Sequence, residues 1–516
     1  QNVTCNNLTV NSGAILQNDY YDEKLTVNGS FTNNGVVQDD PAATSNWFTV
    51  EIAGDLTNNG VWENSYTVLT GSTDQTLTMG TSASFGLGRL EDTDSTSHVI
   101  AGSDLTFSKG FVIDLEDNNN LEGQLILPAG NGFNLYLDSA STYHTWITGN
   151  SNQLHLNNDA YLDSYTHIQD VILKGTVQIS GSSNVFVEGN SVIVEDTLQN
   201  DYNDETLIVK GDLTNNGVIR NDPEAASNWL VIEIAGNIIN NGVWENDYTT
   251  LTGSADQTLT MGASASFGIG RLEDTDSTSH VIAGSDLTFS KGFVIDLEDN
   301  NNLEGQLVLP AGSGFNLYLD SASTYHTWIT GNSNQLHLNN DAYLDSYTHI
   351  QDVILKGTVQ VSGSNNVFVE GNSVIVEDTL QNDYNDETLI VKGSLTNNGV
   401  IRNDPEAASN WFELEISGDI SNNGSWQNED TYLNGTSDQT ISLLNNHAMY
   451  GDIRFYAMKG TGSYQWYLDG NPISGETSEY LATDTLSSDY QGTYYCSTDA
   501  GNSRNIVVET STLSQG

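Results

Sequence analysis

The sequence predicts an all-β protein whose main part is a parallel β-helix, or β-solenoid. Three observations support this fold. Short runs in which Val, Ile, Leu and Phe alternate with polar residues are typical of half-buried strands, and Gly, Asn, Asp and Ser separate them. A long stretch of chain is repeated almost unchanged, and a finer spacing of about 22 to 25 residues recurs inside it. No segment has the sustained 3.6-residue apolar stripe that favours a helix.

The long repeat sets the expected domain organisation. The segment LQNDY begins at Leu16, Leu198 and Leu380, and 198 − 16 = 380 − 198 = 182. Residues 89–125 recur unchanged at 271–307. The third copy follows the pattern only to about Ser442. We therefore expect a first coil or cap over residues 1–15, solenoid repeats over 16–197 and 198–379, a partial third repeat over 380–445, and a separate domain over 446–516.

The finer spacing is clearest in the sequence NNG, which occurs twice in each copy at a spacing of 59 − 34 = 25. Strands at this spacing fit solenoid coils, of which each 182-residue copy would hold roughly eight. The second Asn of each NNG would then stack on its counterpart one coil away, with the side-chain amides bonding to one another. The alternative is that NNG only marks hairpin turns. The residues expected to stack are Asn34, Asn59, Asn216, Asn241, Asn398 and Asn423.

The last 70 or so residues differ in character and contain YQWYLDG followed by GTYYC. This segment resembles an immunoglobulin-like domain of the kind found in bacterial surface proteins, a small β-sandwich. The resemblance implies that Trp466 is the core residue of strand C and that Tyr494 is the tyrosine-corner residue. The cysteine that the family carries on strand B is missing upstream of Trp466, so Cys496 has no partner within the domain.

The chain has one other cysteine, Cys5, near the opposite end of the sequence. Two interpretations stay open. Both cysteines are buried as small apolar residues, or Cys5 and Cys496 form a bond between neighbouring molecules.

Tandem LTNNG-type repeats, the YQWYLDG module and extreme acidity together resemble giant surface proteins of marine Bacteroidota exported by the type IX pathway. That resemblance implies a rigid stalk in an adhesive or hook-like surface appendage. The excess of acidic residues, which keeps a protein hydrated, leads us to expect a secreted, cell-surface location. Because the open end of a solenoid presents unpaired strand edges, we also expect self-association into a homo-oligomer or filament. Cell-surface glycans are further expected partners. The start of the chain at Gln1, without a basic and apolar leader, also fits a mature secreted protein or a trimmed chain.

The charge excludes other partners. With 14 Lys and Arg against 68 Asp and Glu, the formal charge is 14 − 68 = −54. Such a polyanion is repelled by nucleic-acid phosphates and anionic lipid head groups. No run approaches ~18 apolar residues, so we expect no membrane insertion.

Catalysis is not expected. The basic residues that recur in both full copies, Arg89, Lys109 and Lys174 in the first, are spread over several coils, and the histidines show no metal-binding spacing. The alternative is a β-helix that binds or degrades polysaccharides. Exposed Trp and Tyr along one face would favour binding, whereas acids that converge with a basic residue would favour catalysis.

No cofactor is required by the sequence, but acidic clusters in LEDTD and DLEDNNN predict possible Ca²⁺ sites, because Ca²⁺ binds six to eight oxygen ligands. Solvated acidic turns are the alternative. The candidate ligands are Glu91, Asp92, Asp94, Asp114, Glu116 and Asp117, repeated at Glu273, Asp274, Asp276, Asp296, Glu298 and Asp299.

Overall fold

A computed structural model describes most of the chain. It does not describe residues 1, 95, 109, 116–123, 128–134, 139, 149–153, 158–159, 182, 226, 277–278, 291, 298–305, 309–316, 321, 326, 331–335, 340–341, 346, 364, 408 and 512–516. Among the described residues the regular structure is almost all β, with a single 3-10 turn, η3 (Ser488–Tyr490), and no α-helix. The described residues thus include no helix with the length and hydropathy of a membrane-crossing segment.

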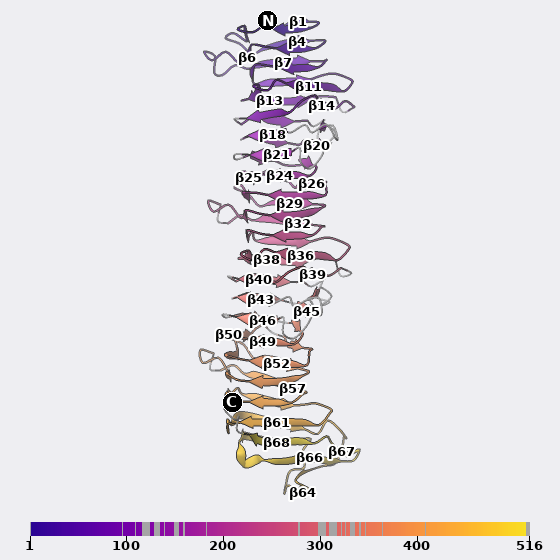
Figure 1. Cartoon of the computed structure of the whole chain (residues 1–516), viewed down its shortest axis with the longest axis vertical. Helices are drawn as coiled ribbons and strands as arrows, with labels where there is room; N and C mark the ends of the chain where they lie inside the picture. Colours follow the sequence, from indigo (N-terminus) through magenta and orange to yellow (C-terminus); the bar gives the residue numbers. More distant parts are fainter. Residues whose placement is uncertain are drawn as a thin grey trace. The chain divides into compact units, whose positions relative to one another are not determined.

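The chain forms two compact units, residues 1–253 and 254–516. The boundary between them falls inside the second 182-residue copy. In the solenoid turns of both units, each strand pairs in parallel with the strand three places later in the sequence, so three strands make one turn (Figure 1). This arrangement confirms the predicted parallel β-solenoid.

In unit 1 the strands form three ladders, each of which contains every third strand. The first ladder contains β1 (Val3–Cys5), β4 (Glu23–Val27), β7 (Phe48–Ile52), β10 (Tyr66–Leu69), β13 (Arg89–Asp92), β16 (Val112–Asp114), β19 (Ser141–Tyr143), β22 (Ala160–Leu162), β25 (Thr176–Ile179), β28 (Thr197–Asn200), β31 (Val218–Arg220) and β34 (Val243–Glu245). The second contains β2 (Leu8–Val10), β5 (Phe31–Asn33), β8 (Leu56–Asn58), β11 (Gln75–Met79), β14 (Val99–Ala101), β17 (Gln124–Ile126), β20 (Trp146–Thr148), β23 (His167–Ile168), β26 (Val185–Val187), β29 (Glu205–Val209), β32 (Leu230–Ile234) and β35 (Tyr248–Leu251). The third contains β3 (Ile15–Gln17), β6 (Val36–Gln38), β9 (Val61–Glu63), β12 (Ser84–Gly86), β15 (Leu105–Ser108), β18 (Leu135–Asp138), β21 (Leu154–Asn157), β24 (Val171–Leu173), β27 (Ser191–Val194), β30 (Asp212–Asn215) and β33 (Ile238–Asn240).

Unit 2 has the same organisation. One ladder contains β36 (Gln257–Met261), β39 (Val281–Ala283), β42 (Gln306–Val308), β45 (Trp328–Thr330), β48 (His349–Ile350), β51 (Val367–Val369), β54 (Glu387–Val391), β57 (Phe412–Ile416) and β60 (Asp430–Leu433). Another contains β37 (Ser266–Gly268), β40 (Leu287–Ser290), β43 (Leu317–Asp320), β46 (Leu336–Asn339), β49 (Val353–Leu355), β52 (Ser373–Val376), β55 (Ser394–Asn397), β58 (Ile420–Asn422) and β61 (Gln439–Leu444). The last contains β38 (Arg271–Asp274), β41 (Val294–Asp296), β44 (Ser323–Tyr325), β47 (Tyr343–Leu344), β50 (Thr358–Val361), β53 (Thr379–Asn382), β56 (Val400–Arg402), β59 (Ser425–Gln427) and β62 (Met449–Tyr456).

The core lies inside the turns, because alternate residues of each strand point inward. In unit 1, Phe31, Trp62 and Phe85 are fully buried on successive turns. Their ring centroids are 5.0 Å and 5.7 Å apart in edge-to-face pairs, a geometry that adds to the stability gained by burial.

The 182-residue period is not a whole number of turns. Strand β4 lies in the first ladder of unit 1, and its counterpart in the next copy, β29, lies in the second ladder. The two are 29 − 4 = 25 strands apart. At three strands a turn, one copy therefore spans eight turns and one third, which agrees with the roughly eight coils expected from the sequence.

The end of unit 2 continues two of its ladders. Strand β62 pairs in parallel with β60 and antiparallel with β65 (Tyr480–Leu486), while β61 pairs with β68 (Ile506–Ser511). Arg504 is buried and its guanidinium donates to Gln439 Oε1, to the Leu433 carbonyl and to the Tyr456 carbonyl. The remaining strands of this region are β63 (Tyr464–Leu468), β64 (Asn471–Pro472), β66 (Gly492–Thr498) and β67 (Gly501–Asn502). The antiparallel strands therefore cover the end of the last solenoid turn.

Each NNG sequence contributes two kinds of asparagine. The second Asn lies near the surface, where Asn59 Nδ2 donates to Asn34 Oδ1 at 2.9 Å, one turn away. The first Asn is fully buried, and Asn33 Nδ2 donates to Asn58 Oδ1 at 2.9 Å. Asn58 also donates to the Ser84 carbonyl and accepts from the Gly60 amide, so it holds the corner of its turn.

The same contacts recur in the later copies. The exposed contacts join Asn241 to Asn216 at 2.9 Å and Asn445 to Asn423 at 2.7 Å, whereas Asn398 is exposed to solvent. The buried contacts join Asn215 to Asn240 and Asn397 to Asn422, each at 2.9 Å.

We expect Asn58→Leu to destabilise the protein far more than Asn59→Leu. The first change removes the acceptor of the part-buried Gly60 amide and the side-chain donor to the Ser84 carbonyl, at a cost of about 1–3 kcal/mol for each group. The second removes an exposed amide contact that water replaces, so its cost should be below about 1 kcal/mol. Thermal and chemical unfolding of the two variants measures the difference, and equal losses would contradict the assignment of the structural role to the first Asn.

Candidate functional site

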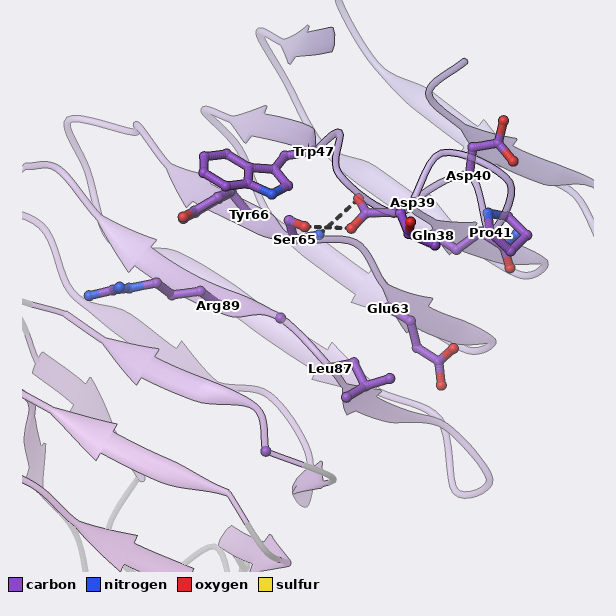
Figure 2. Close-up of a pocket in the computed structure, with 13 residues that line it drawn as sticks. Gln38, Asp39, Asp40, Pro41, Trp47, Glu63, Ser65, Tyr66, Leu87 and Arg89 are labelled. Atoms are coloured by element: carbon purple, nitrogen blue, oxygen red, sulfur yellow. Dashed lines mark hydrogen bonds between the residues drawn. The ribbon is translucent and has the colours of Figure 1, made fainter. Parts of the chain in front are cut away.

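The candidate site is a surface trough in unit 1, with a cavity volume of about 570 Å³ (Figure 2). Three successive corners form most of it, each joining a strand of the third ladder to a strand of the first: residues 39–47 between β6 and β7, 64–65 between β9 and β10, and 87–88 between β12 and β13. Gly110, between β15 and β16, adds a position on the next corner. The trough is lined by Gln38, Asp39, Asp40, Pro41, Thr44, Trp47, Glu63, Ser65, Tyr66, Leu87, Gly88, Arg89 and Gly110.

Asp39 fixes the corner loop in place. Its Oδ1 accepts hydrogen bonds from the Phe48 amide at 2.9 Å and from the Ser65 amide at 3.1 Å. The Ser65 hydroxyl donates to Asp39 Oδ2, as the dashed lines in Figure 2 show. The loop is also bound to the turn before it, because the Asp40 amide donates to Asn18 Oδ1 at 2.7 Å. The loop backbone is therefore held from both neighbouring turns.

An aromatic pair, Trp47 and Tyr66, lies beside the corner loop that Asp39 holds. Trp47 is 52% exposed although it is large and apolar, and its backbone amide donates to Asp22 Oδ1 at 2.8 Å. The Trp47 and Tyr66 rings meet edge to face, with centroids 5.5 Å apart (Figure 2). Leu87, at φ +56°, adds another exposed apolar side chain. The trough thus presents to solvent an aromatic surface whose backbone is fixed by hydrogen bonds.

Arg89 lies next to Tyr66, its partner in the register of β10 and β13, and its guanidinium is already engaged. Its guanidinium donates to Asp114, pairs with Glu91 at 3.2 Å, and lies 5.5 Å from the centroid of the Tyr143 ring. Burial raises the pKa of Glu91, with Arg89 acting in the opposite direction. Two of the expected calcium ligands are therefore paired with a guanidinium. In unit 2, Arg271 makes the same contacts with Asp296 and Glu273.

The other described calcium candidates hold a turn. Asp92 is buried, which raises its pKa to about 6, and its Oδ1 accepts from the Asp94 amide at 3.1 Å. Asp94 Oδ1 in turn accepts from the Thr96 amide and hydroxyl. Asp274 and Asp276 repeat the first contact at 3.0 Å.

Within the described part of the chain, no three His, Cys, Asp or Glu residues are grouped to hold a metal ion. Four of the expected ligands lie outside the described residues: Glu116, Asp117, Glu298 and Asp299.

The residues singled out near the C-terminus are buried. Trp466 is fully buried and its indole donates to the Ser478 carbonyl at 3.0 Å. Tyr494 donates its hydroxyl to the Tyr490 carbonyl at 2.8 Å. Cys496 lies opposite Trp466 in the sheet, and burial raises the pKa of its thiol. Both cysteines are free, but only Cys5 is partly accessible, so a bond between molecules through Cys496 would require local opening.

The aromatic pair of the trough recurs one copy later, still within unit 1. Trp229 is 45% exposed, and its ring centroid lies 5.4 Å from that of Tyr248. Asn221 takes the place of Asp39 and accepts from the Leu230 and Asp247 amides. This pair lies at a corner between the first and second ladders, as the repeat of eight and one third turns requires.

In unit 2 the corresponding loop presents the tryptophan, but no tyrosine stands at the matching position. Trp411 is 55% exposed, and Asn403 holds its loop as Asn221 does. The position that corresponds to Tyr66 and Tyr248 is Asp430.

Sequence reasoning did not single out these tryptophans. The signal available was SNW, which recurs after an Asp-Pro turn in all three copies. Comparison of the chain with protein-family models, with curated proteins and with solved structures gave no match.

Sequence reasoning also missed two buried glutamates. Glu205 is 2% exposed, and neither of its carboxyl oxygens has a hydrogen-bond partner among the described residues. Burial, assisted by the nearby charge of Asp201, raises its pKa from 4.5 to about 9. Glu387 is buried in the same way in unit 2, with its pKa raised to about 8. Both carboxyls are therefore protonated at neutral pH.

We expect Glu205→Gln to raise the melting temperature at pH 8 to 9 and to leave it nearly unchanged near pH 4.5. A carboxyl whose folded-state pKa is raised favours folding below its unfolded pKa of 4.5, and this contribution is lost as pH rises towards 9. Calorimetry from pH 4.5 to 9 measures the effect. The control is Glu224→Gln at an exposed site. A Glu205→Gln advantage that does not grow with pH would contradict the buried neutral carboxyl.

Proposed function

We propose that the chain is a rigid structural segment of an extracellular surface appendage that attaches cells to surfaces or to other cells. The observation that carries the proposal is the three-ladder stacking, with its continuous apolar core, that repeats in both units. Backbone hydrogen bonds between turns run along the stacking direction, so each added turn extends the segment without a flexible joint. Near-identical copies lengthen such a segment rather than diversify a reaction site. The proposal includes no catalytic role and no required cofactor.

Three further expectations belong to this proposal. Residues 446–516 form an immunoglobulin-like domain, which the buried Trp466 and the Tyr494 hydroxyl contact support. The strong acidity suits a hydrated, secreted surface protein that avoids nucleic acids and membranes. The chain self-associates into an oligomer or filament.

Polysaccharide binding is a second candidate function. It is favoured by a specific observation, the held and exposed Trp47–Tyr66 pair in a trough lined with polar side chains.

We expect the length of the folded chain to change in steps with the number of 182-residue copies. One copy spans 25 strands, or eight and one third turns, and strands lie about 4.8 Å apart, so each copy should add about 40 Å. Small-angle scattering and electron microscopy of chains with residues 198–379 deleted or duplicated would measure this. Circular dichroism controls for folding. If the chains fold but their maximum dimension does not change with the number of copies, the stalk proposal is overturned.

A further inference from the structure

We infer that the trough around Trp47 and Tyr66 binds an uncharged polysaccharide chain, and that the Trp229–Tyr248 pair is a second binding position for the same ligand. This inference rests on the proposed attachment function and names the class of surface to which the protein attaches.

The aromatic pair supplies the stacking surface. A pyranose ring has an apolar face of C–H groups that packs on an indole or phenol ring, and its hydroxyls remain free to hydrogen-bond at the edge. Trp47 is 52% exposed, yet its backbone is bonded to Asp22 and its loop is bonded through Asp39. A side chain held in advance loses little conformational freedom when a ligand binds, so more of the contact energy appears as affinity.

The polar lining selects for an uncharged ligand. Asp40 and Glu63 supply carboxylate acceptors for sugar hydroxyls, while Asp39 holds the loop (Figure 2). Among the described residues that line the trough, Arg89 is the one cationic side chain, and it is paired with Asp114 and Glu91. A uronate or sulfated sugar would therefore meet carboxylates without a vacant counter-charge, in a chain of formal charge −54.

The repeat supports a ligand with many equal subunits. Trp47–Tyr66 and Trp229–Tyr248 have nearly the same ring separation, 5.5 Å and 5.4 Å. In the view of Figure 1, the loops after β6 and after β31 project to the same side of unit 1. A long polymer that engages both positions gains avidity, because the second contact is intramolecular. Trp411 is equally exposed but faces no tyrosine at the matching position, so it provides an internal control.

The test uses the full chain and four oligosaccharides: cellohexaose, mannohexaose and chitohexaose as uncharged probes, and hexagalacturonate as the anionic probe. Isothermal titration and tryptophan fluorescence report binding. We expect at least one uncharged probe to bind at two positions per chain, and hexagalacturonate to bind at least tenfold more weakly. Trp47→Ala and Trp229→Ala should each remove one position, the double variant should remove both, and Trp411→Ala should change neither.

Trp47→Phe keeps an aromatic face and should weaken binding by less than Trp47→Ala, which separates loss of stacking from loss of folding. The inference is overturned if no uncharged probe binds at millimolar concentration, if the folded double variant binds as the parent does, or if hexagalacturonate binds best. Scattering on the same samples separates this from the stalk proposal: a chain whose length follows copy number but which binds no sugar would overturn only the inference made here.

Discussion

The parallel pairing of each strand with the strand one turn later is the constraint on which the rest of the structure depends. It requires that successive turns approach to the distance of a backbone hydrogen bond at the corners as well as along the strands. The corner glycines show how close this approach is: a Cβ on Gly60 would lie 2.1 Å from the carbonyl oxygen of Gly35, one turn away. The buried Asn33 and Asn58 meet the same requirement beside these glycines, because their amides pair backbone groups that the turn would otherwise leave unsatisfied.

The solenoid could be predicted from the sequence, because the alternation of apolar and polar residues and the fixed short spacing can both be recognised in short stretches of chain. The sequence located the NNG corners but favoured the exposed second Asn, since two adjacent residues share the same spacing and spacing does not tell which one points inward. It also gave roughly eight turns for each repeat. Only the observed pairing of β4 and β29 in different ladders gives the additional third of a turn.

The trough could not have been predicted in the same way. Trp47, Tyr66 and Leu87 are about twenty residues apart and come together only because three successive corners stack in register. The acidic clusters also make contacts that their spacing did not predict. Glu91 and Asp114 were expected as calcium ligands because carboxylates supply oxygen, and the stacked turns bring Arg89 into contact with both of them. Glu205, which has no feature in the sequence to distinguish it from other acids, becomes buried only when the turns stack.

The additional third of a turn has a consequence for how such a chain can change over generations. The counterpart of β4 in the next copy, β29, lies in another ladder, so corresponding strands fit more than one ladder of the solenoid. Nearly identical tandem copies are the substrate on which unequal recombination acts. A gain or loss of one copy shifts every later strand to the adjacent ladder, and each strand then meets a neighbour of the kind it already pairs with. The reading frame, the pairing and the core all survive the exchange, so the number of copies can be inherited as a variable trait.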